Sequence, residues 1–286
     1  MTEQEFTGWY RRIHRAVIGL ADKISTPDSV LRRRLSPAYT TLLYGLSAGR
    51  GTPADINGET YRIDPRFRWH LHPRYEAELA AFLRARLRPG QCCIDVGANI
   101  GIYVMQMARW VAPGGRIVAF EPNPGTFEVL ARHVRMNDLS ERVTLVPLAA
   151  GREAGAARLF DDQAGSGLSR LGGANPSIGG PVAATDVQVT TIDAYCSNTG
   201  TRPDWILIDV EGYEFDVLAG AAETIRRLRP GVIVELHPHL YPDGETTRAE
   251  GARLIRDLGL VPVPVDDPTR DPWSAGAVSL QFAVRS

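Results

Sequence analysis

The chain has 286 residues, which is enough for one α/β domain of ordinary size and an N-terminal extension. Its formal net charge is −1, so no strong field draws it to nucleic acid or to a membrane surface. No segment approaches the about 20 apolar residues of a membrane span, the N-terminus lacks a signal-peptide pattern, and three cysteines without zinc spacing fit a reducing compartment. We therefore expect a cytoplasmic protein that has no nucleic-acid partner and no membrane span.

Two helices are expected near the N-terminus, over residues 5–23 and 28–48, because apolar side chains recur there at helical spacing. The segment Thr26-Pro27-Asp28 separates them, since proline ends one helix and aspartate can start the next. The pair is amphipathic and basic. We expect it to cap the main domain or to form a homodimer contact, and docking on a membrane surface or on a partner is the alternative.

A β-hairpin is predicted over residues 54–64, with Asn57 and Gly58 at the turn because these residue types accept positive φ angles. Residues 1–73 are thus predicted to form an N-terminal helical cap plus the β-hairpin. Over residues 74–286, strand and helix patterns alternate. This alternation predicts a Rossmann-like α/β domain with a seven-stranded, mostly parallel sheet.

The elements of this domain follow from the apolar runs and from the Gly and Pro residues between them. Strands are expected at residues 92–96, 116–120, 143–148, 205–210, 232–237, 260–265 and 279–284. Helices are expected at residues 74–87, 100–111, 124–137, 215–229 and 246–258. An insert after the third strand is expected to hold two short strands, at 157–160 and 187–192, around a mobile loop at 161–185.

A ligand-binding turn is predicted where the first strand of the sheet leads into a helix, at Asp95–Gly101. Gly97 permits a tight turn, and Gly101 permits a close approach between the backbone and a ligand. The first amides of the following helix suit a carboxylate or a phosphate. Asp95, at the end of the strand, is placed to accept a hydrogen bond from a ligand ammonium group.

Glu121 stands at the end of the next strand, about twenty residues after the glycines, where a carboxylate can bind both hydroxyls of a ribose. A solvated loop carboxylate is the alternative. Asp95 would repel a pyrophosphate and attract the ammonium of a methionine group, so the cofactor is expected to be S-adenosylmethionine and not NAD. The residues expected to hold or approach the cofactor are Asp95, Gly97, Asn99, Gly101, Glu121, Pro122, Asn123 and Ala149.

A reacting group is predicted at the ends of two later strands. Asp209 and Glu211 follow one of them, and Glu235 and His237 follow the other. The carboxyl ends of parallel strands meet at one edge of the sheet, so these side chains are expected to share a crevice. His237 is the expected base, because the unperturbed pKa of histidine lies near neutrality. Alternatively, Asp209, Glu235 and His237 hold a divalent cation such as Mg²⁺, which would acidify an acceptor hydroxyl.

Four motifs in this region resemble those of the FkbM family of class I methyltransferases. They are Asp95–Gly101, Glu121–Asn123, Ile208–Glu214 and Glu235–Pro238. The resemblance implies methyl transfer from S-adenosylmethionine to a hydroxyl of a small-molecule acceptor, either a sugar or a natural product such as a polyketide or glycoside. The alternatives are a nicotinamide-dependent oxidoreductase and a non-catalytic module that binds S-adenosylmethionine and a partner.

Overall fold

The structure, a computed structural model, divides into two compact units. The first comprises Met1–Ala77 with Arg135–Asp138, and the second comprises Glu78–Val134 with Leu139–Ser286. The described residues are 8–10, 12, 39–45, 47, 49–161, 169–173, 182–241, 243, 245–267, 269 and 280–285. Most of the two expected N-terminal helices, with their expected homodimer contact, and most of the loop at 161–185 therefore lie outside the described residues.

The described part of the first unit contains the predicted hairpin. Its strands are β1 (Thr52–Ile56) and β2 (Glu59–Ile63), and they pair antiparallel. Asn57 and Gly58 have φ angles of 50° and 82° at the turn, which confirms the role expected of them. Within the same unit, the Asn137 side chain accepts from the amide of Arg62 at 2.9 Å and donates to its carbonyl at 2.8 Å. These two bonds satisfy backbone groups of β2 that face away from β1.

The second unit is built on a seven-stranded sheet with the order β12-β13-β11-β10-β3-β4-β5. Neighbouring strands from β11 to β5 are parallel, while β13 runs antiparallel to both β11 and β12. The sheet thus has the expected Rossmann-like, mostly parallel architecture. Each strand lies within two residues of the range predicted from the sequence: β3 Cys92–Val96, β4 Arg116–Phe120, β5 Val143–Val146, β10 Trp205–Ile208, β11 Gly231–Leu236, β12 Val261–Pro264 and β13 Leu280–Arg285.

Helices connect these strands; one of them, α6, was not predicted, and one predicted helix is divided in two. They are α3 Ala77–Arg86, α4 Ile102–Trp110, α5 Pro124–Met136, α6 Ile192–Thr199, α7 Glu214–Gly220, α8 Ala222–Leu228 and α9 Glu245–Asp257. Residues 215–229 were expected to form one helix, but the structure has two. The carboxylate of Asp193 accepts from the amides of Glu223 at 2.9 Å and Thr224 at 2.7 Å, and so it caps a new helix start.

A second correction concerns α6, whose first residue was predicted to end a strand at 187–192. Thr191 is the N-cap of this helix, and its hydroxyl accepts from the amide of Ala194 at 2.9 Å. Ile192 is therefore helical and completely buried. The apolar residues before Thr191 still belong to a strand, which ends at Thr190.

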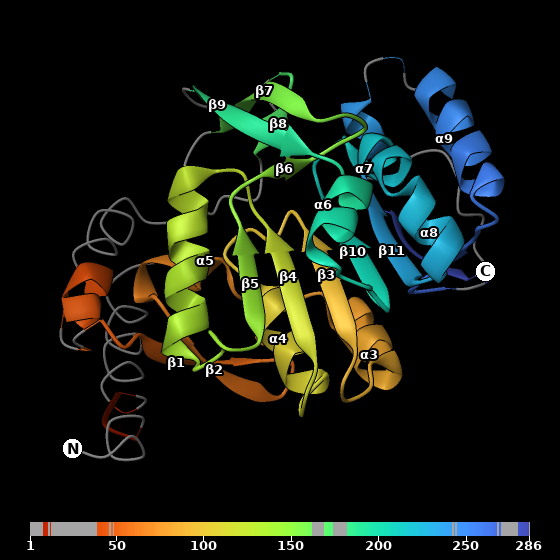
Figure 1. Cartoon of the computed structure of the whole chain (residues 1–286). Helices are drawn as coiled ribbons and strands as arrows, with labels where there is room; N and C mark the ends of the chain where they lie inside the picture. The colour runs from red at the N-terminus through yellow and green to blue at the C-terminus, as the bar shows by residue number, and fades with distance from the viewer. Residues whose placement is uncertain are drawn as a thin grey trace. The chain divides into compact units, whose positions relative to one another are not determined.

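Helices α6 to α9 cover one face of the sheet, and Figure 1 shows α6, α7 and α8 together on that side. The buried cluster takes alternate residues of each strand, because successive side chains point to opposite faces. From the strands it contains Ile94, Val96, Val118, Phe120, Ile206, Ile208, Val232 and Val234, and from the helices it contains Ile192, Leu218, Ile225 and Ile255. This packing fixes the positions at which the parallel strands end.

A small second sheet lies beyond the carboxyl ends of β4 and β5 (Figure 1). Its strands are β6 (Ala149–Ala150), β7 (Gly155–Asp161), β8 (Arg170–Leu171) and β9 (Ala183–Thr190), in the order β6-β9-β7-β8. The expected pair of short strands corresponds to β7 and β9, which pair antiparallel. The small sheet has its own hydrophobic cluster, formed by Ala149, Leu159, Leu171 and Val187. Within the described part of the chain, no helix is long and apolar enough to cross a membrane.

Candidate active site

The ends of β3 and β10 meet through backbone contacts at the predicted ligand-binding turn. The amide of Asp209 donates to the carbonyl of Val96 at 3.0 Å. Gly97 has a φ angle of 85°, and a Cβ atom at this position would lie 1.8 Å from the carbonyl oxygen of Asp209. Glycine at position 97 thus serves two needs, a left-handed backbone and direct contact with the next strand. The backbone of the turn is therefore in direct contact with the backbone of Asp209, and a shift in one would displace the other.

The carboxylate of Glu121 is buried and fixed by two backbone amides. Oε1 accepts from the amide of Asn123 at 2.8 Å, and Oε2 accepts from the amide of Asn99 at 2.9 Å. Burial raises the pKa of Glu121 to about 7; the two amides act in the opposite direction, and Asp161 adds to the rise. A carboxylate held in this way at the end of β4 can accept two hydrogen bonds from a vicinal diol.

The turn between β3 and α4 offers further groups that fit a nucleoside cofactor with a methionine-like end. The Oδ1 atom of Asn99 is buried and has no hydrogen-bond partner among the described residues. The N-cap of α4 is Gly101, which has no side chain to satisfy the first amides of the helix. Asp95 is buried at the end of β3, with 3% of its surface exposed. Acceptors and backbone donors therefore stand together near Glu121, as a ligand with ammonium and carboxylate groups requires.

Asn123 has a structural role that the sequence analysis did not anticipate. Its Oδ1 atom accepts from the amides of Gly125 at 2.9 Å and Thr126 at 3.1 Å, so it caps the start of α5. Its Nδ2 atom donates to the carboxylate of Asp161 and lies 3.5 Å from the hydroxyl of Ser169. Asn123 therefore ties the end of β4 to the small sheet, and its expected approach to the cofactor stays a prediction.

Three other expected cofactor residues are placed as follows. Ala149 is buried in the cluster of the small sheet. Pro122 is half-buried between the two residues that flank it. A Cβ atom at Gly101 would lie 2.4 Å from a terminal methyl group of Leu130, so this glycine makes room for a side chain of α5. The close approach of a ligand that was expected at Gly101 stays a prediction.

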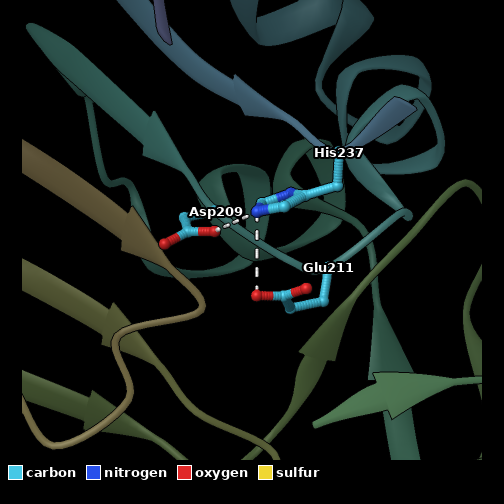
Figure 2. A group of neighbouring side chains, drawn as sticks. All are labelled: Asp209, Glu211 and His237. Atoms are coloured by element: carbon cyan, nitrogen blue, oxygen red, sulfur yellow. Dashed lines mark ion pairs between the residues drawn. The ribbon is translucent and has the colours of Figure 1, made fainter. Parts of the chain in front are cut away.

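The structure brings together the four residues expected at the reacting edge. The Nε2 atom of His237 lies 3.8 Å from Oδ1 of Asp209, 3.7 Å from Oε1 of Glu211 and 3.9 Å from Oε1 of Glu235. Figure 2 shows the carboxylates of Asp209 and Glu211 directed toward the imidazole ring of His237. Residues from the ends of β10 and β11 therefore form one cluster, which we call the histidine–carboxylate cluster.

Glu214, which was not predicted as a site residue, completes this cluster. Its side chain is 0% exposed, and its Oε1 atom lies 2.8 Å from Nδ1 of His237. The same oxygen accepts from the amide of Gly212 at 2.8 Å, and Oε2 accepts from the hydroxyl of Tyr241 at 3.2 Å. Because the carboxylate accepts from Nδ1, the Nε2 atom of His237 is directed at the other three carboxylates.

The carboxylates change the protonation of His237. Burial opposes the charged form of the ring, but the hydrogen bond to Glu214 and the charges of Asp209, Glu214 and Glu211 outweigh it, and the pKa of His237 is raised to about 10. The ring thus carries a proton at neutral pH when no ligand is bound. This differs from the near-neutral pKa on which the expectation of a histidine base rested.

The small sheet is also attached on this side of the unit. Arg170 donates from Nη2 to the carbonyl of Leu240 at 2.7 Å. A Cβ atom at Gly172 would lie 2.7 Å from the hydroxyl of Tyr213, so the residue that follows β8 lies against the segment that follows β10. With Asn123 on the other side, the small sheet is held at both the Glu121 end and the His237 end of the sheet edge.

The chain is similar to known methyltransferases. A family model for the methyltransferase FkbM domain matches residues 95–259, a span that holds every residue of the candidate site. The hexuronic acid methyltransferase AglP of Haloferax volcanii is 28% identical over 193 residues, which cover 66% of this chain and 74% of that protein. The 31-O-demethyl-FK506 methyltransferase FkbM of Streptomyces tacrolimicus is 28% identical over 211 residues, which cover 64% of this chain and 77% of that protein.

Among solved structures, the methyltransferase FkbM of Methylobacillus flagellatus aligns with a TM-score of 0.44 and 17% identity. The alignment covers 69% of this chain and 44% of that longer chain. The family match spans more than half of the chain and includes both the Glu121 turn and the histidine–carboxylate cluster. The chain therefore belongs to the FkbM family of methyltransferases.

Proposed function

We propose that this methyltransferase transfers a methyl group from S-adenosylmethionine to a hydroxyl of a small molecule, a sugar or another natural product. One observation carries the proposal: the fixed carboxylate of Glu121 at the end of β4 and the histidine–carboxylate cluster after β10 and β11 lie at the same edge of one sheet, with β3 between β4 and β10. The names of two relatives refer to a hexuronic acid and to 31-O-demethyl-FK506. Both names are consistent with an oxygen-bearing small molecule as acceptor.

The cofactor is proposed to bind along the turn between β3 and α4. Glu121 accepts one hydrogen bond from each of the two ribose hydroxyls, and the charge of the carboxylate strengthens these bonds. Asp95 and Oδ1 of Asn99 receive the ammonium group, and the first amides of α4 receive the carboxylate. S-adenosylmethionine supplies a methyl group that is already activated on a sulfonium, so the protein contributes mainly by holding donor and acceptor in line.

The acceptor hydroxyl is proposed to lie against the histidine–carboxylate cluster. The hydroxyl must lose its proton as the oxygen attacks the methyl group, and the carboxylates of Asp209, Glu211 and Glu235 beside His237 provide the groups that take it. A divalent cation in the same cluster would orient and acidify the hydroxyl. The small sheet, held at both ends of this edge, excludes water from the reaction.

Family membership favours methyl transfer over the hydride transfer that was considered from the sequence. The remaining alternative is a module that binds the cofactor without turnover. Incubation with S-adenosylmethionine and a panel of sugars, uronic acids and polyketide alcohols separates the two, because an enzyme forms S-adenosylhomocysteine only when a suitable acceptor is present. Cofactor binding without product from any acceptor in the panel would favour the binding module.

Calorimetric titration with S-adenosylhomocysteine tests the cofactor assignment, with NAD as the comparison ligand. Glu121→Ala is expected to weaken binding at least tenfold, because both ribose hydrogen bonds are lost. Glu128→Ala is the matched control, since this carboxylate is 77% exposed on α5 and belongs to no part of the site. Unchanged affinity for S-adenosylhomocysteine in Glu121→Ala, or a preference of the wild type for NAD, would contradict the proposed cofactor pocket.

A further inference from the structure

We propose that Asp209, Glu211 and His237 form a binding site for a divalent cation, with Mn²⁺ as the best-matched ion. One ligand atom from each of these residues lies within 4.8 Å of the others. Figure 2 shows the three side chains converging from the segments that follow β10 and β11. The proposal that a cation binds here depends only on these three ligand residues. Only its action on an acceptor hydroxyl rests on the proposed function.

The imidazole of His237 has the placement of a metal ligand, and a bound ion takes the place of the proton that Nε2 carries in the free protein. Its side chain is only 8% exposed, and its Nε2 atom faces the carboxylates. The oxygens of Glu211 and Asp209 are 3.7 Å and 3.8 Å from Nε2, which is longer than a hydrogen bond. An octahedral ion with bonds of about 2.1 Å holds neighbouring ligand atoms about 3 Å apart. Binding would therefore draw each carboxylate inward by less than about 1 Å.

Glu214 orients the imidazole ring of His237 within the cluster. A histidine that binds a metal almost always donates its other ring N–H to a carboxylate or carbonyl, which fixes the tautomer and the orientation of the ring. Glu214 does this from a fully buried position, 2.8 Å from Nδ1 of His237. The amide of Gly212 and the hydroxyl of Tyr241 hold Glu214 in place in turn. Glu214 is thus a positioning residue that directs Nε2 toward the cation.

The charge and the ligand types favour a divalent ion that accepts both oxygen and nitrogen ligands. Oxygens of four carboxylates lie within 3.9 Å of the imidazole nitrogens of His237, and such a group attracts a divalent cation. Mg²⁺ and Ca²⁺ prefer oxygen ligands alone, whereas imidazole nitrogen suits transition metals, and Mn²⁺ accepts both. The ligand set differs from the one expected from the sequence, because Glu211 takes the place of Glu235 in the convergent group.

Electron paramagnetic resonance tests the site on the metal-free protein, without any substrate. Titrated Mn²⁺ is expected to bind one ion per chain, and pulsed spectra of the bound ion are expected to show coupling to an imidazole nitrogen. Asp209→Asn, Glu211→Gln and His237→Gln are each expected to weaken binding at least tenfold, and His237→Gln should also remove the nitrogen coupling. Asp186→Asn is the control, because it removes the same charge from a side chain that is 86% exposed on β9.

Glu214→Gln tests the positioning role. Loss of the buried carboxylate is expected to weaken Mn²⁺ binding about tenfold to a hundredfold, while one bound ion per chain and the nitrogen coupling persist at high Mn²⁺. Affinity for S-adenosylhomocysteine, measured on every variant, shows that the protein is folded and that the cofactor turn is intact.

The outcomes distinguish the proposed cation site from the proposed methyl-transfer function. If the wild type binds no stoichiometric Mn²⁺, or binds it without nitrogen coupling, the cation site is wrong even when cofactor binding and turnover are normal. If Mn²⁺ binds as described but S-adenosylhomocysteine does not, the proposed function is wrong and the cation site stands. Equal Mn²⁺ affinity in the wild type and in all three ligand variants would place the ion elsewhere.

Discussion

Binding of S-adenosylhomocysteine is expected to depend on pH through Glu121, whose pKa in the free protein is about 7 because the side chain is buried. The ribose hydroxyls donate to the charged carboxylate, so binding favours the ionised form and lowers this pKa. The free protein must lose a proton before it binds when the pH is below about 7. Affinity therefore rises with pH through that value and levels off above it.

The size of the effect follows from the same pKa. Roughly one carboxylate in eleven is ionised one unit below its pKa and ten in eleven one unit above, so affinity at pH 6 is expected to be about tenfold lower than at pH 8. If binding restores the ordinary value of 4.5, the shift of about 2.5 units limits the whole effect to about 3 kcal/mol. At pH 6, binding is expected to release nearly one proton.

Calorimetry in two buffers of different ionisation enthalpy measures both the affinity and the released proton. Glu121→Gln should bind weakly and show no pH dependence between pH 6 and 8. Glu128→Gln should behave as the wild type does, because this side chain is exposed. Equal wild-type affinity at pH 6 and pH 8, with no proton release, would show that Glu121 does not bind the ribose as a carboxylate.

Three further variants probe other parts of the site. His237→Ala should lower turnover at least tenfold and leave affinity for S-adenosylhomocysteine within about twofold, and normal turnover would exclude His237 from the reaction. Gly97→Ala should lower the urea midpoint more than Gly259→Ala does, because both positions have positive φ but only a Cβ at 97 would collide with the backbone of Asp209; equal midpoints would contradict the contact. Asn123→Ala should cost about 1 kcal/mol in urea unfolding through loss of the α5 cap, and an unchanged midpoint would argue against that role.

The parallel sheet could be predicted because its strands carry a local signal. Runs such as Ile206–Ile208 and Val232–Val234 are apolar on both faces, as strands covered by helices must be, and Gly or Pro residues mark their ends. The start of α6 was missed because Thr191 follows a β-branched run, and only its bond to the amide of Ala194 distinguishes a cap from another strand residue. The break between α7 and α8 depends on Asp193, which is distant in sequence.

Part of the candidate site could likewise be predicted from the sequence, and part of it could not. The rule that ligands bind at the carboxyl ends of strands was enough to group Asp209, Glu211, Glu235 and His237. Glu214 was part of a quoted motif, yet its partnership with His237 joins the start of α7 to the end of β11 and depends on how the two segments pack. The raised pKa of His237 has the same origin, since it reflects neighbours in space that its own segment does not reveal.

The close contact between Gly97 and Asp209 has a thermodynamic consequence. Any ligand that shifts Asp209 also displaces the turn between β3 and α4, because no side-chain atom separates the backbones of Gly97 and Asp209. This turn bears the groups proposed to bind the cofactor. Linkage between two sites is reciprocal. If an ion at the histidine–carboxylate cluster tightens binding of S-adenosylhomocysteine by some factor, then S-adenosylhomocysteine must tighten binding of that ion by the same factor, so the donor and acceptor halves of the site act as a cooperative pair.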